Sequence, residues 1–348
     1  MWNFRRLKGN QSIYNMNLKE IASQLNLSFS TVSKALRDSH EISDATKKMV
    51  LAKAKELNFE VNPFASSLRK QKSKTIAVVI PEVVNDFFGP VINGIESIAQ
   101  EKGYHVLIYL THEDVKKEIA VTKLLQNGRV DGILISISEQ TSDIMHLEEL
   151  KAKEIPLVFF DRVVERINVP KVTTDDYNSG AKATEHLIEN GCRRIGFLFI
   201  SQSLSISNQR MTGYFEALKK SNLPIDNSLI VNCPGDDEKN KKLIRELLTR
   251  KERPDGIFAS LEKLAIDTYE ICEELELNIP RDVKVICFSN LKTAGLLNPS
   301  MSTITQPAFE IGMEAAAILF KIIEKKGHQF ISERTVINSK LIVRNSTK

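Results

Sequence analysis

The residues with the clearest chemical potential lie near the N-terminus, in the run LKEIASQLNLSFSTVSKALR that spans residues 18–37. The second half of this run places hydroxyl groups, one aromatic ring and two cations on one helical face, which carries Phe29, Ser30, Ser33, Lys34 and Arg37. Hydroxyls and cations can hydrogen-bond to base edges in a major groove, and an aromatic ring can contact thymine methyl groups. These residue types at this spacing indicate a surface that reads duplex DNA.

Two short helices and a tight turn must position that surface. Apolar residues recur at helical spacing on both sides of Asn26, and Ala22 is small enough to let two helices cross closely. Asn26 suits the turn because its short side chain tolerates a positive φ. We expect Ser28 to cap the second helix, and Ser43 to cap a third helix over residues 46–57. A three-helix module with another role would show the same pattern.

A short segment after this module, NPFASSLR at residues 62–69, has the features of one more helix. Asn62 can cap it, and Pro63 fits its first position. A helix of eight residues is not stable alone in water, so we expect it to form when it pairs with a second copy in a minor groove. Leu68 would then wedge between base steps, with Arg69 near a phosphate. A basic linker is the alternative interpretation.

The charge of the chain is divided unevenly. Residues 1–74 carry 14 Lys and Arg against 6 Asp and Glu, a net charge of +8, whereas the whole 348-residue chain carries +4 and the remainder therefore −4. A basic head on a mildly acidic body favours a polyanion as the partner of the head alone. A solvated charged face would look the same, so charge supports the DNA interpretation without establishing it.

Composition is that of an ordinary globular protein, with 42% hydrophobic and 26% charged residues. Apolar runs are shorter than the roughly 18 residues that span a bilayer, and the N-terminus lacks the apolar core of a secretory signal. The four cysteines have no metal-type spacing, so we expect reduced thiols in a cytoplasmic protein without a membrane contact. Residues 1–16 precede the pattern and are interpreted as a disordered or mis-started extension, with Met16 as the alternative start.

From Thr75 onward, strand-like apolar runs alternate with amphipathic helical stretches. The runs lie at residues 75–80, 105–110, 132–137, 156–160, 194–200, 256–260 and 283–288. This alternation predicts parallel sheets with helices on both faces, and continuous apolar strands predict sheets buried on both sides. Gly103 and Gly191 directly follow two predicted helices. A residue in the left-handed conformation commonly ends a helix at this position, and glycine adopts that conformation without steric strain. About 270 residues of this pattern exceed one compact sheet, so we expect two similar α/β lobes.

The order of these parts matches one known family. The stretch from LKEIASQLNLSFSTVSKALR to NPFASSLR resembles the DNA-binding head and hinge helix of the LacI/GalR family, the lactose- and purine-repressor type of transcriptional regulator. The runs TIAVVIPEVVNDFF, IPLVFFDR, DDYNSGAKATEHLIENGCRRIGFL, SISNQRMTGYFEAL and STITQPAFEIG extend the resemblance to about residue 345. It implies a dimeric regulator associated with the bacterial nucleoid, usually a repressor, that binds palindromic operator DNA near carbohydrate-related genes.

The implied fold is an all-α helix-turn-helix head on an α/β body of two lobes, like a periplasmic binding protein, in which the chain crosses between the lobes three times. By position, the crossings are expected near Asp175, near Thr305–Gln306 and near residues 328–334. The implied domains are 1–16 as the extension, 17–60 as the helix-turn-helix domain, 61–74 as the hinge helix and linker, 75–174 with about 305–329 as the first lobe, and 175–304 with about 330–348 as the second lobe.

The resemblance also implies roles in DNA binding. The positions of Phe29, Ser30 and Lys34 read bases in the family, whereas those of Lys19, Ser28 and Thr31 touch phosphates. The full predicted set is Lys19, Ser28, Phe29, Ser30, Thr31, Ser33, Lys34, Arg37, Asn62, Ala65, Leu68 and Arg69. This sequence departs from the family at the turn, where Asn26 replaces the usual glycine. Lys34 stands where Arg is more frequent, which puts a bidentate guanine contact in doubt.

A cleft between two α/β lobes is a natural site for a small-molecule effector. The family positions that commonly line it are occupied here by Phe87, Phe88, Asp161, Arg210, Glu262, Ser289 and Asn290. Arg210 is the leading candidate to grip ligand hydroxyls or a carboxylate, with a structural ion pair as the alternative. One of Phe87 and Phe88 is expected to point into the core. Leu261-Glu262 and Ser289-Asn290 replace the usual Asn-Asp and aspartate pair, so either the effector is not a simple neutral hexose or the site is partly degenerate.

Neither the cysteines nor the six histidines form a catalytic or metal-binding motif, so no enzyme activity, cofactor or metal is expected. The predicted function is a ligand-responsive, sequence-specific DNA-binding regulator with a sugar or sugar derivative as effector. Two alternatives stay open. One is a DNA-binding regulator whose body binds no ligand and serves only for dimerisation. The other is a solute-binding protein for transport, against which the missing signal peptide and the attached head both argue.

Overall fold

The computed structural model describes residues 18–57, 59, 73–84, 86–234, 237–324 and 333–348. The chain divides into two compact units, a head within residues 1–70 and a body from residue 71 to the C-terminus. The predicted extension 1–16 and the predicted hinge helix, with Asn62, Ala65, Leu68 and Arg69, lie outside the described residues. Along the described part of the chain, no helix combines the length and apolarity needed to cross a bilayer.

In its described residues the head has three helices, α1 (Leu18–Gln24), α2 (Phe29–Ala35) and α3 (Asp44–Glu56). They enclose a small core made by Ile21, Ala22, Val32, Ala35, Val50 and Ala54. Asn26 makes the turn at a φ of 51°, and Ser28 Oγ accepts the Thr31 N–H at 3.0 Å, both as predicted. Ser43 caps α3 in the same way, through the Thr46 N–H at 3.3 Å. Helices of seven residues are unstable alone, so the shared core and the caps hold them.

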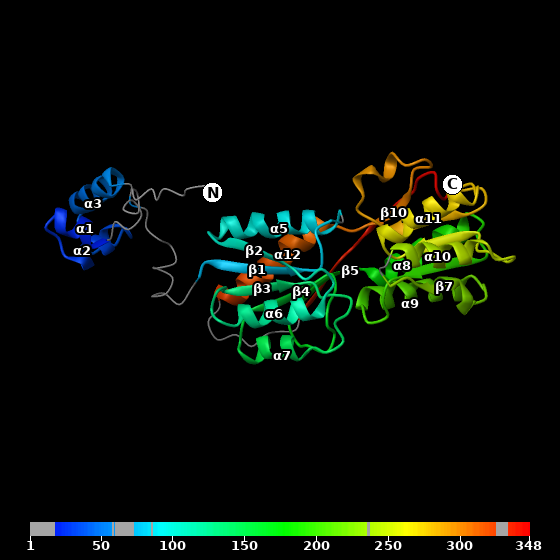
Figure 1. Cartoon of the computed structure of the whole chain (residues 1–348), viewed down its shortest axis with the longest axis horizontal. Helices are drawn as coiled ribbons and strands as arrows, with labels where there is room; N and C mark the ends of the chain where they lie inside the picture. The colour runs from blue at the N-terminus through cyan, green and yellow to red at the C-terminus, as the bar shows by residue number, and fades with distance from the viewer. Residues whose placement is uncertain (1–17, 58, 60–72, 85, 235–236, 325–332) are drawn as a thin grey trace, which may run out of the picture. The chain divides into compact units, whose positions relative to one another are not determined.

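The first sheet of the body has the strand order β11-β5-β4-β3-β1-β2, with every pair parallel (Figure 1). Its strands are β1 (Thr75–Ile80), β2 (His105–Leu110), β3 (Gly132–Ile135), β4 (Leu157–Phe160), β5 (Lys171–Thr174) and β11 (Arg334–Ile337). One face is covered by α5 (Phe88–Glu101) and α12 (Ala308–Glu324), and the other by α6 (Val115–Leu125) and α7 (Met145–Ala152). The sheet and its two helical layers form the first lobe.

The second sheet has the order β12-β10-β9-β8-β6-β7, in which only the β10–β12 pair is antiparallel. Its strands are β6 (Ile195–Phe199), β7 (Ile230–Asn232), β8 (Gly256–Ala259), β9 (Lys284–Phe288), β10 (Ser302–Thr305) and β12 (Lys340–Ile342). Helices α8 (Asp176–Glu189) and α9 (Ser205–Lys220) cover one face, and α10 (Asp237–Leu248) and α11 (Glu262–Glu274) the other. Two short 3-10 helices, η1 (Asn227–Leu229) and η2 (Lys292–Gly295), complete this second lobe.

All seven predicted apolar runs contain a strand, and the two predicted helix-ending glycines have φ values of 67° (Gly103) and 96° (Gly191). Strands β5, β7, β10, β11 and β12 fall outside the prediction; β7 and β12 are only three residues long, and β5 and β10 contain two Thr residues each. The expectation of burial on both sides was wrong for β2, whose Leu107 and Ile108 are 42% and 46% exposed. β2 is an edge strand, so one of its flanks has no neighbouring strand.

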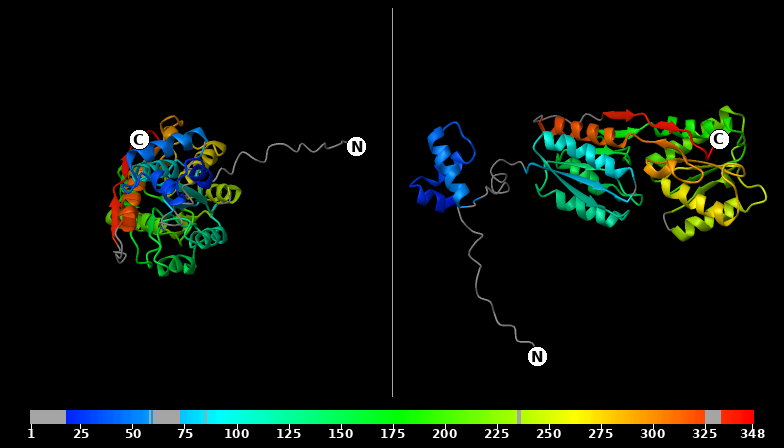
Figure 2. Two further views of the ribbon diagram at one scale, coloured as in Figure 1. Left: turned by 90° about the vertical axis from the view of Figure 1, so that its left-hand side faces the viewer. Right: turned by 90° about the horizontal axis from the view of Figure 1, so that it is seen from above.

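Three segments carry the chain between the sheets: Asp175 between β5 and α8, residues 306–307 between β10 and α12, and residues 338–339 between β11 and β12 (Figure 2). The third crossing was expected near residues 328–334, and this position is corrected. Strand β11 pairs with β5 in the first sheet, with Arg334 opposite Lys171, so the chain leaves the first lobe only after Ile337.

Candidate DNA-binding face and effector cleft

Helix α2 presents three of the predicted DNA-binding side chains to solvent, Phe29, Ser30 and Lys34. Phe29 is 42% exposed, and Ser30, Lys34 and Arg37 are exposed as well, as is Lys19 on α1. The exposed ring of Phe29 at the start of α2, with Lys34 in its last turn and Arg37 just beyond its end, forms a surface that can enter a groove, because base edges and phosphates are then both within reach.

Ser33 is only 6% exposed, which contradicts its predicted place on the outer face of α2. Its hydroxyl oxygen accepts a hydrogen bond from the Arg37 guanidinium, one helical turn further on. Residues 32 and 33 both face the head core, because the apolar stripe of a short helix spans more than one residue per turn. Ser33 therefore orients Arg37 within the head. Lys34 also has a partner that the sequence prediction missed, the carboxylate of Glu41.

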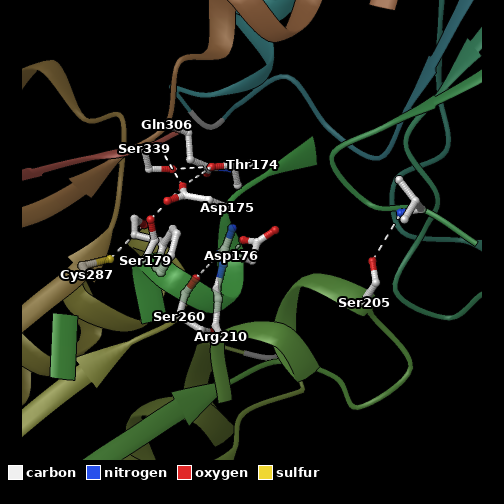
Figure 3. Close-up of polar contacts among 12 residues, drawn as sticks. Thr174, Asp175, Asp176, Ser179, Ser205, Arg210, Ser260, Cys287, Gln306 and Ser339 are labelled. Atoms are coloured by element: carbon white, nitrogen blue, oxygen red, sulfur yellow. Dashed lines mark hydrogen bonds and ion pairs between the residues drawn. The ribbon is translucent and has the colours of Figure 1, made fainter. Parts of the chain in front are cut away.

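The first and third crossings of the body are joined by Asp175. Its Oδ1 accepts the Ser339 N–H at 2.7 Å and the Ser179 hydroxyl at 2.9 Å (Figure 3). The second crossing is held by Asn290, whose Nδ2 donates to Gln306 O at 2.8 Å and whose Oδ1 accepts the Gln306 N–H at 3.1 Å. Asn290 was predicted to bind the effector; in this structure its amide anchors a crossing segment.

Arg210 is buried, with 1% of its surface exposed. Its Nε donates to Asp176 Oδ1 at 2.7 Å and its Nη1 donates to Ser260 O at 2.6 Å (Figure 3). The guanidinium carbon also lies 3.7 Å from the centre of the Phe288 ring. Burial raises the pKa of Asp176 to about 6, although Arg210 opposes the rise. The ion pair that the sequence left as the alternative role of Arg210 is therefore present.

Two glycines bring Arg210 and Asp176 together, because they let α8 and α9 approach closely. A Cβ at Gly180 would lie 2.5 Å from Arg210 O, and a Cβ at Gly213 would lie 2.2 Å from Tyr177 O. Only glycine fits such backbone contacts without a shift of one helix. Asp176 was missed by the sequence prediction, since the DDYNSG run gives no sign of which distant cation it meets.

On the first lobe, Asp161 and Arg162 follow β4. Asp161 is buried at a φ of 57°, and burial raises the pKa of its carboxyl group. Arg162 Nη1 donates to both carboxylate oxygens of Glu113, at 2.7 and 3.0 Å. Glu113 follows β2 in a turn in which His112 and Glu113 both have positive φ, at 53° and 59°. This partner was also missed, since neither residue is a glycine or asparagine that would signal such a turn.

The structure brings two other predicted residues together. The Ser289 hydroxyl donates to the carboxylate of Glu262, at the start of α11. Burial raises the pKa of Glu262, the Ser289 hydrogen bond opposes this, and the Asp86 carboxylate adds to it. Asp86 belongs to the first lobe and accepts the Lys292 N–H of the second lobe at 3.4 Å, so these acidic groups lie where the lobes meet.

The two predicted aromatic residues are both buried, Phe87 at 8% exposure and Phe88 at 1%. Their rings pack edge to face with centres 5.2 Å apart, within the core of the first lobe. The expectation that only one of them points into the core is corrected, because both rings pack there. Neither ring presents an open face on which the CH surface of a sugar could stack.

A cavity of about 170 Å³ lies at the junction of the two lobes. Its walls come from β5, β11, the loop after β4 and the starts of α8 and α9, with Val163, Glu165, Thr173, Thr174, Asp175, Asp176, Tyr177, Asn178, Ser205, Gln209, Arg334 and Val336 as lining residues. None of the seven predicted effector residues lines it. The cavity adjoins the Arg210–Asp176 pair through Asp176, which is one of its lining residues.

The four cysteines are buried free thiols. Burial raises the pKa of Cys192, Cys233 and Cys272 to about 12, and that of Cys287 rises well above its usual range. A thiol reacts as its thiolate, so these side chains are poor nucleophiles at neutral pH.

Comparison with known proteins matches both units to family models. Residues 17–62 match the model described as "Bacterial regulatory proteins, lacI family", and residues 73–345 match "Periplasmic binding proteins and sugar binding domain of LacI family". Similar relatives include the transcriptional repressor PurR of Photobacterium profundum, 28% identical over 95% of this chain and 98% of that protein. The ribose operon repressor of Halalkalibacterium halodurans is 29% identical over 95% of this chain and 97% of that protein.

Solved structures agree with these matches. A putative ribose operon repressor from Burkholderia thailandensis superposes with a TM-score of 0.70 at 26% identity, over 78% of this chain and 99% of that one. The lac repressor dimer bound to operator shares the fold alone, with a TM-score of 0.83 at 19% identity over 95% of this chain and 99% of that one. The chain belongs to the LacI family of bacterial transcriptional regulators, with a DNA-binding head and a body of the periplasmic sugar-binding type.

Proposed function

We propose that this regulator is a repressor of carbohydrate-related genes that binds a near-palindromic operator as a homodimer and responds to a sugar or sugar derivative. The observation that carries the proposal is the exposed face of α2, a recognition helix whose Phe29 and Lys34 are presented by a capped three-helix head. The names of two relatives, the transcriptional repressor PurR and a ribose operon repressor, support it. We propose no catalytic activity for the chain.

In the proposed complex, Phe29, Ser30 and Lys34 contact base edges, while Lys19 and Thr31 contact phosphates. Base contacts carry specificity and phosphate contacts carry affinity for any duplex. Lys34→Ala should therefore lower affinity for the operator by about 1–3 kcal/mol and weaken binding to a scrambled duplex much less. Gel-shift titrations of both duplexes measure this, with DNA fragments selected from the source genome as operators. Equal losses on both duplexes would contradict a base-reading role.

The proposed effector site lies between the lobes, with Asp161, Arg210, Glu262 and Ser289 as its polar groups. One neighbouring structure, a regulator from Enterococcus faecium at 26% identity and a TM-score of 0.67, is described with bound ribose, which supports this class of ligand. Binding would change the separation of the lobes and so the pairing of the hinges, and such couplings typically amount to about 1–3 kcal/mol. Thermal-shift screening against sugars, amino sugars and sugar acids tests it.

A ligand-free body is the second candidate, and one observation favours it. Arg210 pairs with Asp176, and Glu262 pairs with Ser289, so polar groups that would bind an effector are already satisfied within the protein. Under this alternative, no compound of the panel raises the melting temperature, and operator binding is insensitive to all of them. A shift with one compound, lost in Arg210→Lys, would support the effector site.

The proposed homodimer has a candidate surface in β2. Leu107 and Ile108 are large apolar residues, about half exposed on an edge strand, and such edges favour pairing with another chain. Ile108→Glu should convert the dimer to a monomer in sedimentation velocity and weaken operator binding. A dimer that persists in this variant would place the interface elsewhere.

A further inference from the structure

The recognition helix carries a cation whose side chain is already engaged. Lys34, in the last turn of α2, donates from Nζ to the carboxylate of Glu41, in the loop between α2 and α3. Both side chains are about half exposed, at 46% for Lys34 and 53% for Glu41. The hydrogen bond to Lys34 lowers the pKa of Glu41, so its carboxylate is charged at neutral pH. A negative charge therefore stands beside the base-reading lysine, on a face proposed to meet a polyanion.

Two other cations of the head, Arg37 and Lys47, have different partners. Arg37 donates to the neutral hydroxyl of Ser33, and Lys47 pairs with Asp38 at 2.7 Å. Among the base-reading and phosphate-contacting residues proposed above, Lys34 is the one for which the structure gives an acidic partner. A lysine ammonium is a point charge on a flexible stem, so it can attach to any phosphate within reach as readily as to a base.

We propose that Glu41 is a specificity-determining residue, which holds Lys34 away from the DNA backbone and releases it to a base edge of the operator. This inference rests on the proposed DNA-reading role of α2. A backbone phosphate offers Lys34 one charge and brings its own negative charge toward Glu41. A guanine edge offers two neutral acceptors, O6 and N7, without that repulsion. Glu41 therefore penalises nonspecific complexes more than the specific complex.

The size of the effect follows from the exposure of the pair. Exposed ion pairs contribute up to about 1 kcal/mol, so the bias on Lys34 corresponds to a change in affinity of up to about fivefold. Nonspecific binding depends on charge and falls steeply with salt, so the effect should be largest at low ionic strength.

The test uses the full-length protein and compares Glu41→Gln with Glu56→Gln. Glu56 forms a similar exposed pair with Lys53, at 2.8 Å, so its variant removes the same charge from the same head without freeing Lys34. Fluorescence anisotropy measures affinity for a selected operator and for a scrambled duplex of equal length. Glu41→Gln should tighten binding to the scrambled duplex about fivefold and to the operator less than twofold. Glu56→Gln should leave the ratio of the two affinities unchanged.

A second measurement shows whether Glu41 acts through Lys34. In the Lys34→Ala background, Glu41→Gln should no longer change the ratio of operator to scrambled affinity. Equal tightening on both duplexes, weaker operator binding, or the same change of ratio without Lys34 would each overturn the role of Glu41. If the unaltered protein fails to prefer any selected fragment over the scrambled duplex, the proposed function fails instead, so the two failures are distinguishable.

Discussion

In the head, most side chains proposed to bind DNA are exposed and lie on one seven-residue helix. The polar side chains proposed for the effector site are mostly buried and come from segments far apart in the chain. Lys34 is half exposed, and Arg210 is 1% exposed. An exposed group can be removed at little cost to the fold. A buried ion pair that loses one partner leaves an uncompensated charge in the interior. The two regions should therefore respond to substitution in opposite ways, one through binding and the other through stability.

The largest contrast in stability is expected when Arg210 and Lys34 are each replaced by alanine. Arg210→Ala leaves the Asp176 carboxylate buried without its partner, which should lower the free energy of unfolding of the body by about 3–5 kcal/mol. Lys34→Ala removes only an exposed ion pair with Glu41 and should lower it by no more than about 1 kcal/mol. Urea denaturation followed by circular dichroism measures both. Similar losses in the two variants would remove the distinction between the regions.

A pH dependence should single out the body. The pKa of Asp176 is raised to about 6, so the folded state holds this proton more tightly than the unfolded state. The free energy of unfolding should therefore fall as the pH rises from about 4 to 6, by at most about 3 kcal/mol. Asp176→Asn should lack this part of the slope. Denaturation of both proteins at pH 4.5 and 7 gives the difference, and parallel curves would show that Asp176 titrates normally.

Replacing Gly213 by alanine, at the contact between α8 and α9, tests how the Arg210–Asp176 pair is positioned. Gly213→Ala places a Cβ against Tyr177 O, so α9 must shift relative to α8, at a cost of about 1–3 kcal/mol. Ala at Gly89 is the control, because a Cβ there meets no atom within 4 Å. Thermal unfolding should show the loss in the Gly213 variant alone. An equal loss at Gly89 would attribute the effect to the helix backbone in general.

The smallest effect is expected at the start of the recognition helix. Ser28→Ala removes the side-chain acceptor for the Thr31 N–H, which should destabilise α2 by about 1 kcal/mol. Ser28→Asn keeps a capping oxygen and should restore stability. Hydrogen exchange of the α2 amides reports the change. Unaltered exchange in Ser28→Ala would mean that the head core alone holds the helix.

The sequence predicted the head more fully than the cleft, and particular residues explain why. Asn26, Ser28 and Ser43 act on groups within three residues, so their roles are visible in a short stretch. Asp176 and Arg210 are 34 positions apart, and Glu262 and Ser289 are 27 apart. Residue types at single positions indicated a polar cleft, but not which of these groups would pair with each other.

By itself, the sequence determined the helix-turn-helix, its caps, seven of the strands and the alternation that makes parallel sheets. These features depend on local hydrogen bonds and on hydrophobic periodicity, which neighbouring residues express together. Tertiary structure alone decided that both Phe87 and Phe88 are buried, that Ser33 faces the head core, that β11 joins the first sheet and that Arg210 pairs with Asp176. Those outcomes depend on which surfaces meet after the chain has folded, and burial then forces each polar group to find a partner from a distant segment.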